Sequence, residues 1–161
     1  GPSMKTSPAH KTRYAQIGLG GRGGCYVDAI QKCFAQNAQL VALCDVNPGR
    51  LQLRLDACRR AGAAVAAFAP EDFDRMVAET RPERVIVTTR DDSTNMMVAQ
   101  VAREVLGVRQ AVARVFDPAR EAIYHGLDIE TVCPTVLAAD EAIERLSASL
   151  AASGKSREAA S

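Results

Sequence analysis

A glycine-rich turn is the part of this sequence whose residue types and spacing could do chemistry. Residues 18–23 read Gly-Leu-Gly-Gly-Arg-Gly, directly after an apolar segment and directly before a segment with helical periodicity. Gly18 permits a tight turn, Gly20 lets the backbone approach a pyrophosphate, and Gly23 lets the helix pack close to the strand. The free N–H groups and the positive dipole end of that helix would face the phosphates. The turn therefore predicts a nucleotide phosphate loop, against the alternative of an ordinary glycine turn without a ligand.

An acidic residue follows the next apolar segment. Asp45 lies directly after residues 39–44, where a carboxylate can accept hydrogen bonds from a ribose diol. A carboxylate there repels a 2′-phosphate, so NAD(H) is favoured over NADP(H). Arg50, one turn into the next helix, could soften that preference. Asp45 could also cap the turn into Pro48, and capping and ribose binding can coexist.

The elements that must position these residues alternate between strand and helix. Apolar segments predict six strands at residues 13–17, 39–44, 64–68, 84–89, 111–115 and 129–133. Helices are predicted at 22–35, 48–61, 71–80, 93–106, 118–126 and from 134 onward. This alternation predicts an α/β fold: a single Rossmann, doubly wound parallel sheet of six strands in the order 3-2-1-4-5-6.

One domain accounts for most of the chain. Residues 1–12 are polar, begin with a Gly-Pro-Ser-Met run that resembles a protease-cleavage scar, and are expected to be a disordered leader. Residues 13–150 are expected to form the domain, and residues 151–161 a flexible tail. An apolar stripe on the last helix (Ile143, Leu146 and Leu150) could join two copies as a homodimer, or it could pack on its own sheet.

Composition excludes several classes of partner. The net charge of +1 gives no electrostatic footprint for nucleic acid, and no apolar stretch is long enough for insertion into a membrane. The five cysteines form no metal-ligand spacing, and we expect buried thiols in a reducing cytoplasm. The two histidines, His10 and His125, are far apart in sequence, so a metal site is not expected.

The N-terminal half resembles the Gfo/Idh/MocA oxidoreductases over residues 13–92. The segments that carry this resemblance are residues 14–23 (YAQIGLGGRG), 41–48 (VALCDVNP) and 83–92 (ERVIVTTRDD). The resemblance implies a Rossmann half with strands one to three and the edge of strand four.

The C-terminal half, from about 85 to 146, resembles a KTN/RCK (TrkA-N) domain, the nucleotide-sensing domain of Trk-type potassium uptake systems. The segments that carry it are Thr88, residues 91–95 (DDSTN), 112–118 (VARVFDP) and 126–135 (GLDIETVCPT). Because both families build the same scaffold, we interpret the chain as an engineered chimera of two Rossmann halves, with a natural mosaic as the alternative.

The two resemblances imply binding positions that would meet across one ligand between strands one and four. The cofactor-binding candidates are Gly18, Gly20, Gly21, Arg22, Gly23, Asp45, Val46, Thr88, Thr89, Asp92, Asn95 and Arg114. Some have structural alternatives: Arg22 could be solvated, Asp92 could cap the following helix, and Arg114 could form an ion pair.

Catalysis is not expected. Gfo/Idh/MocA enzymes use a lysine in a Glu-Lys-Pro segment after strand five and a large C-terminal substrate domain. Residues 114–118 read Arg-Val-Phe-Asp-Pro, without lysine, and no second domain is visible. The sequence therefore predicts a domain that binds an adenine dinucleotide, NAD(H), without turnover; NADP, ADP and ATP are less favoured ligands. The alternatives are a regulatory domain of a potassium transporter and a non-autonomous oxidoreductase fragment.

Overall fold

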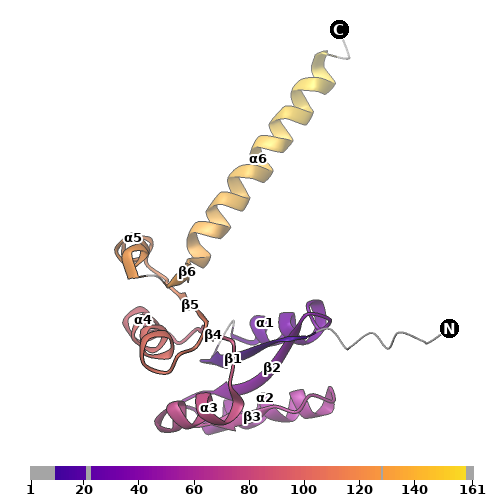
Figure 1. Ribbon diagram of the computed structural model, residues 1–161. Coiled ribbons are helices and arrows are strands. Elements are labelled where there is room, and N and C mark those ends of the chain that lie inside the picture. The colour runs from indigo at the N-terminus through magenta and orange to yellow at the C-terminus, as the bar shows by residue number, and fades with distance from the viewer. Residues whose placement is uncertain (1–9, 21–22, 128, 159–161) are drawn as a thin grey trace, which may run out of the picture.

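The fold is built on one parallel sheet of six strands. The computed structural model describes residues 10–20, 23–127 and 129–158. The strands are β1 (Thr12–Ile17), β2 (Ala38–Cys44), β3 (Ala66–Phe68), β4 (Arg84–Val87), β5 (Gln110–Arg114) and β6 (Glu130–Val132). They lie in the order β3-β2-β1-β4-β5-β6, and every neighbouring pair is parallel (Figure 1). This confirms the predicted fold class and strand order.

Helices connect the strands in the predicted alternation. They are α1 (Gly23–Asp28) continued by a π-helical turn η1 (Ala29–Cys33), α2 (Pro48–Arg60), a 3-10 turn η2 (Pro70–Asp72), α3 (Phe73–Thr80), α4 (Asp92–Gln100) continued by a π-helical turn η3 (Val101–Val105), α5 (Pro118–Tyr124), a 3-10 turn η4 (His125–Leu127) and α6 (Pro134–Glu158). Asn47 and Asp117 cap α2 and α5 through their side chains, each before a proline at the first helical position. This pair of a capping residue and a proline is the sequence signal that predicts where each of these two helices begins.

The sheet buries a separate apolar cluster on each face. One cluster joins strand residues such as Ala15 and Val85 to Met76 of α3 and Met96 of α4. The other joins Leu43 and its neighbours on β2 to side chains of α1 and α2. Two covered faces explain why the central strands read as almost continuous apolar runs.

A bulge in β2 moves its side chains from one face to the other. Tyr14 pairs with Leu40 but Ala15 pairs with Ala42, so Val41 is an extra residue in the strand. Because strand side chains alternate, one extra residue reverses the alternation beyond it. Leu40 and Leu43 consequently lie in the same cluster although they are three positions apart, an odd spacing that puts side chains of a regular strand on opposite faces.

The first helix departs from the predicted apolar face. The sequence predicts Tyr26, Ile30, Cys33 and Phe34 on one side of an α-helix. The π-helical turn η1 shifts the phase after Asp28, so Ile30 is buried but Cys33 and Phe34 are exposed. The expectation of buried thiols is therefore wrong for Cys33, and also for the exposed Cys25; the other three cysteines are buried.

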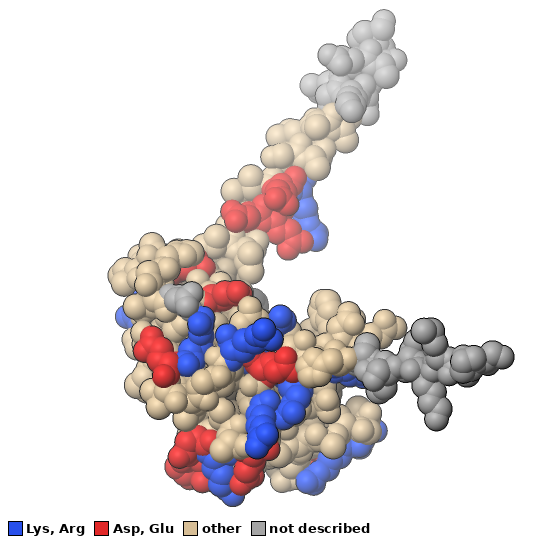
Figure 2. All heavy atoms as spheres, viewed as in Figure 1, with Lys and Arg blue, Asp and Glu red and all other residues tan. Residues whose placement is uncertain are grey.

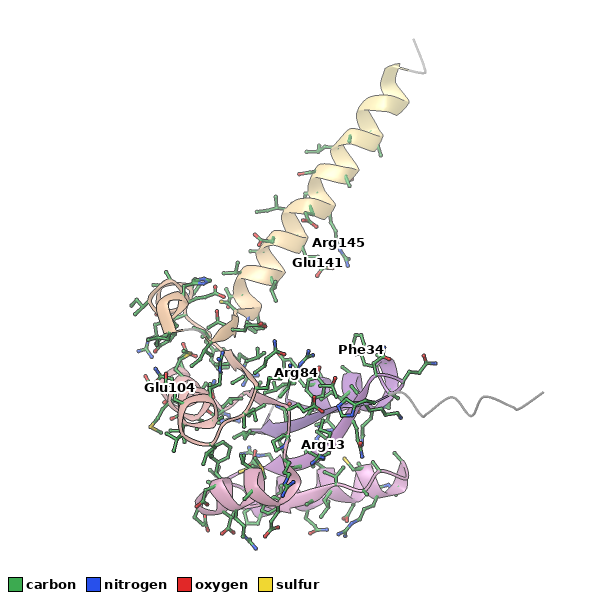
Figure 3. All side chains as sticks on the ribbon, viewed as in Figure 1. Arg13, Phe34, Arg84, Glu104, Glu141 and Arg145 are labelled. Carbon is green, nitrogen blue, oxygen red and sulfur yellow. The ribbon has the colours of Figure 1, made fainter. Side chains whose placement is uncertain are left out.

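Helix α6 extends away from the sheet (Figure 1). Its 25 residues correspond to a length of about 37 Å. Ile143, Leu146 and Leu150 are 62%, 66% and 74% exposed, so the stripe does not pack on its own sheet. The ion-paired Glu141 and Arg145 lie on this projecting part (Figure 3). The helix also continues to Glu158, so residues 151–158, expected as a flexible tail, are helical.

Candidate functional site

A pocket of about 350 Å³ lies at the carboxyl ends of β1, β2 and β4. Strands β1 to β3 are added toward one edge of the sheet and strands β4 to β6 toward the other, so the strand order reverses between β1 and β4. Ligands of doubly wound folds bind in the crevice at this point. Six of the predicted cofactor-binding residues line the pocket: Gly18, Gly20, Asp45, Val46, Thr88 and Thr89. The volume is within the range typical of small-molecule sites.

Gly18 makes the close approach between the first turn and β4. Its φ of +87° is in the region that favours glycine, and an added Cβ would lie 2.7 Å from backbone atoms of Thr88 and Thr89. The Thr88 hydroxyl donates to the Gly18 carbonyl at 2.9 Å and accepts from Nε2 of the buried Gln16 at 2.6 Å. The turn is therefore fixed to β4 by backbone contact and by side-chain hydrogen bonds.

Asp45 is buried and holds the glycine turn from the end of β2. Its Oδ2 accepts from the backbone N–H of Leu19 at 2.6 Å, and its Oδ1 accepts from the N–H of Asn47 at 2.7 Å. Arg50 approaches the same Oδ1, at 3.3 Å from Nη2 and 3.4 Å from Nε. Both carboxylate oxygens are thus engaged, and the carboxylate shapes the pocket as well as charging it.

Asp92, Asn95 and Arg114 do not line the pocket. All three are buried beside it and bond to the backbone: Asp92 accepts from the N–H of Phe116 at 2.8 Å, and Arg114 donates to the carbonyls of Thr88 and Thr89. The amide of Asn95 donates to the Arg114 carbonyl and accepts from the N–H of Thr89. The structure therefore gives these three residues a role in fixing the loops after β4 and β5, and their contact with a ligand stays a prediction.

Two predicted positions, Gly21 and Arg22, lie outside the described residues, and Gly23 is the first residue of α1. The alternative that Asp92 caps α4 is wrong, because Asp91 is the N-cap and accepts from the N–H of Thr94. Asp91 and Thr94 line the pocket, together with Arg90. Their signal in the sequence is the polar run directly after strand four, in which the predicted residues Asp92 and Asn95 each lie one position after a residue that lines the pocket.

The charges at the pocket are balanced. Arg50 and Arg90 line it together with Asp45 and Asp91. Basic and acidic side chains also alternate over the face of the globular part that Figure 2 shows. The pocket therefore has two cations available to anionic groups of a ligand, and each acidic neighbour already accepts hydrogen bonds within the protein.

Cys44 lines the pocket from the end of β2, and burial raises the pKa of its thiol to about 11, with the neighbouring Asp45 adding to the rise. The folded chain therefore keeps this proton at pH values where the unfolded chain loses it. The resulting stabilisation is complete below about pH 9 and is lost as the pH rises toward 11. We expect the free energy of unfolding to fall more steeply over this window in the parent chain than in Cys44→Ala. Urea unfolding across this pH range measures both slopes, and equal slopes would contradict the assignment.

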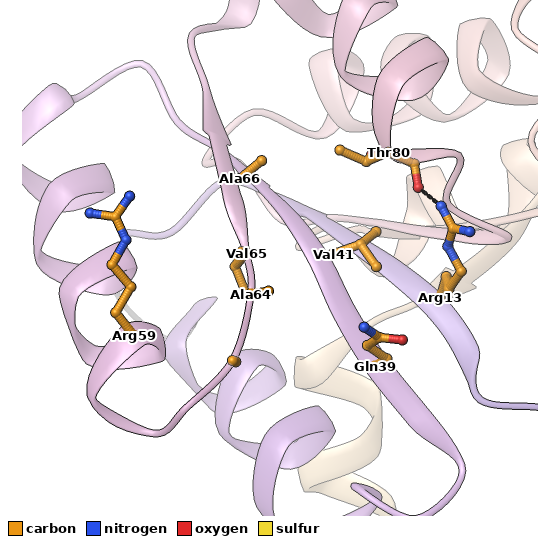
Figure 4. A pocket seen from close by; sticks show the side chains of 9 residues that line it. Arg13, Gln39, Val41, Arg59, Ala64, Val65, Ala66 and Thr80 are labelled. Carbon is orange, nitrogen blue, oxygen red and sulfur yellow. Dashed lines mark hydrogen bonds between the residues drawn. The ribbon is translucent and has the colours of Figure 1, made fainter. Parts of the chain in front are cut away.

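A second, larger cavity of about 640 Å³ lies at the opposite edge of the sheet, at the amino ends of β1 and β2. Arg13 and Arg59 lie on different sides of it, and the Arg13 guanidinium donates to the Thr80 carbonyl (Figure 4). This edge carries none of the predicted binding residues, and doubly wound folds bind ligands at the other edge. The smaller pocket is therefore the candidate site.

Within the described residues, no helix combines the length and apolar character that a membrane crossing requires. The same part of the chain contains no group of three or more His, Cys, Asp or Glu side chains placed to hold a metal ion.

A parallel sheet in this order, with a glycine turn and a pocket at the point where the strand order reverses, defines a Rossmann-type nucleotide-binding domain. The TrkA-N domain family matches residues 39–135, from β2 to the first residues of α6. This match covers more than half of the sequence, and the chain belongs to the TrkA-N domain family.

Known proteins resemble the chain over different parts of its length. The Trk system potassium uptake protein TrkA of Streptomyces coelicolor is 42% identical over 55 residues, which are 34% of this chain and 25% of that protein. The chain thus spans about a quarter of this curated relative.

Solved structures of two kinds share the fold. The TrkA-N domain of the inner membrane protein ybaL from Escherichia coli has a TM-score of 0.64 at 17% identity, over 86% of this chain and 98% of that domain. The WlbA dehydrogenase from Bordetella pertussis, solved in complex with NADH and UDP-GlcNAcA, has a TM-score of 0.51 at 25% identity, over 65% of this chain and 29% of the enzyme.

Proposed function

We propose that this chain is a non-catalytic nucleotide-binding module that takes an adenine dinucleotide, NAD(H), in the pocket at the carboxyl ends of β1, β2 and β4. The observation that carries the proposal is that the glycine turn, Asp45 directly after β2 and Thr88 directly after β4 meet at one pocket although they are far apart in sequence. In this fold the glycine turn faces a pyrophosphate and the acidic residue an adenosine ribose.

The local geometry supports a phosphate beside Gly20. A Cβ built at Gly20 would contact only the end of the Arg50 side chain, with Nη1 at 3.3 Å. The packing of the fold therefore does not require glycine at this position, whereas a phosphate in the pocket would need the space that a side chain would take. The bound NADH in the structurally similar WlbA dehydrogenase agrees with the choice of ligand class.

Substitution of Gly20 tests the site directly. Calorimetric titration of the parent chain with NADH should show one site per chain, and Gly20→Val should weaken binding at least about thirtyfold because its side chain would occupy the pyrophosphate path. Thermal unfolding should stay close to that of the parent. Gly126→Val is the matched control, since nothing lies within 4 Å of a Cβ there. Unchanged NADH binding by Gly20→Val would place the ligand elsewhere.

Nucleotide sensing for a potassium transporter is the second candidate function. The family and the identity with a potassium uptake protein favour it, and the role would be regulatory, in the cytoplasm, without turnover. Nicotinamide-linked turnover by the isolated chain would instead favour the third candidate, a fragment of an oxidoreductase. An origin as a chimera of two Rossmann halves is supported by the dehydrogenase-like segment at residues 14–23, which precedes the matched residues 39–135. The other two dehydrogenase-like segments, 41–48 and 83–92, lie within that match.

A second copy of this chain is the proposed partner of α6. Val136, Ile143 and Leu150 recur every seven residues, and Leu146 lies between the last two at coiled-coil spacing. Two α6 helices could bury this stripe against each other without disturbing either sheet, because Ile143, Leu146 and Leu150 are exposed in the single chain.

A further inference from the structure

Arg50 lies between Asp45, at the proposed ribose end of the pocket, and Gly20, at the proposed pyrophosphate position. Its Nη2 and Nε face Oδ1 of Asp45, and its Nη1 lies 3.3 Å from the position that a Cβ of Gly20 would take. The Arg50 side chain is 37% exposed, whereas the Asp45 side chain is 3% exposed. The guanidinium, not the carboxylate, is therefore the charged group that the pocket presents to a ligand at this point.

The carboxylate has little capacity left for a ribose diol. Both of its oxygens accept backbone N–H bonds, from Leu19 and Asn47, and one also faces Arg50. The exclusion of a 2′-phosphate by an acidic residue depends on an uncompensated negative charge, and here an arginine compensates it at 3.3 Å. The guanidinium also offers a planar fork of N–H donors, which suits a phosphate.

We propose that Arg50 is a specificity-determining residue that lets the pocket accept an adenosine ribose carrying a 2′-phosphate, so that NADP(H) binds as well as NAD(H). The Arg50 side chain is 37% exposed, so its guanidinium can meet a phosphate at the ribose while it stays beside Asp45 and compensates that charge. This proposal rests on the proposed function, because it concerns the same pocket, and it removes the preference for NAD(H) that Asp45 alone predicts.

The experiment compares NADH and NADPH on the parent chain and on Arg50→Gln by calorimetric titration. The parent should bind the two with dissociation constants within about threefold of each other. Arg50→Gln should weaken NADPH binding by about tenfold to a hundredfold, because a charge-assisted hydrogen bond is lost and Asp45 is left uncompensated. NADH binding should change less than about threefold, so the ratio of the two constants is the readout.

Arg54→Gln is the matched control. Arg54 lies one turn further along α2, with its guanidinium over Gly24, and does not line the pocket. The same substitution there should leave the ratio of NADPH to NADH dissociation constants unchanged. Arg50→Lys should give a ratio between those of the parent and Arg50→Gln, because it keeps the charge but loses the fork. Thermal unfolding of each variant checks that the fold is retained.

The outcomes separate this inference from the function on which it rests. Tight binding of NADH with no binding of NADPH by the parent chain would overturn the role of Arg50 and leave the proposed function intact. Equal loss of both dinucleotides in Arg50→Gln would also overturn it, since Arg50 would then contact a group common to both. Failure of the parent to bind either dinucleotide would overturn both proposals.

Discussion

Gly18→Ala is expected to lower the free energy of unfolding by about 3 kcal/mol. At a φ of +87° any L side chain is strained, and the new Cβ would lie 2.7 Å from the carbonyl carbon and oxygen of Thr88 and from the nitrogen of Thr89. These are backbone atoms at the end of the central strand β4, so they cannot turn aside as a side chain would. Urea unfolding near neutral pH measures the loss.

Gly62→Ala separates strain from contact. Gly62 has a similar φ of +79°, but nothing lies within 4 Å of a Cβ there, so only the backbone strain should appear, about 1 kcal/mol. The difference between the two variants is the effect of the contact with Thr88 and Thr89. If the two variants lost the same free energy of unfolding, the backbone of Thr88 and Thr89 would have moved to accommodate the added methyl group. The close contact between Gly18 and these residues would then not be a fixed part of the pocket's geometry.

The strands, the helices and therefore the strand order could be predicted because each element has a signal in its own local sequence. Apolar runs, caps such as Asn47 with a following proline, and the glycine turn are all signals within a few residues. Together with the preference for right-handed crossovers they leave few arrangements of six strands. The π-helical turn after Asp28 has no such signal, and it turned two predicted core residues, Cys33 and Phe34, toward solvent.

The site was predicted in part, for a physical reason. Gly18, Asp45 and Thr88 each come directly after a strand, and the carboxyl ends of these strands meet, so their place at the pocket follows from topology. The bonds of Asp92 to the backbone of Phe116 and Asp117 join segments more than twenty residues apart. No local pattern distinguishes a carboxylate that faces a ligand from one that holds a neighbouring loop, and the same holds for Asn95.

The pairing of Arg50 with Asp45 illustrates the same limit. The sequence places Arg50 five residues after Asp45, but only the three-dimensional structure shows that both oxygens of the buried Asp45 carboxylate accept hydrogen bonds. From the sequence, Asp45 favours NAD(H), and Arg50 could soften that preference. The structure shows the two side chains in contact, and the proposal that NADP(H) binds as well as NAD(H) is based on this pair.

Leu146→Glu is expected to convert a dimer into a monomer. Burying an aliphatic side chain contributes about 1.5–3 kcal/mol, and Leu146 would be buried in both copies, so the loss should raise the dissociation constant at least about a hundredfold. A carboxylate at that position would also lie close to its counterpart in the second helix and repel it. Light scattering after size-exclusion chromatography measures the mass, against 17.2 kDa for one chain.

Ala148→Glu provides the matched control, because it adds the same charge to the same helix away from the apolar stripe. It should leave the dimer intact. Since Leu146 is 66% exposed in the single chain, neither substitution should alter the unfolding of the sheet domain itself. A parent chain that is monomeric at every concentration would contradict the proposed pairing. A long exposed helix with heptad spacing would then need another partner to cover its apolar stripe, and the regulatory candidate, in which the module is part of a larger assembly, would gain support.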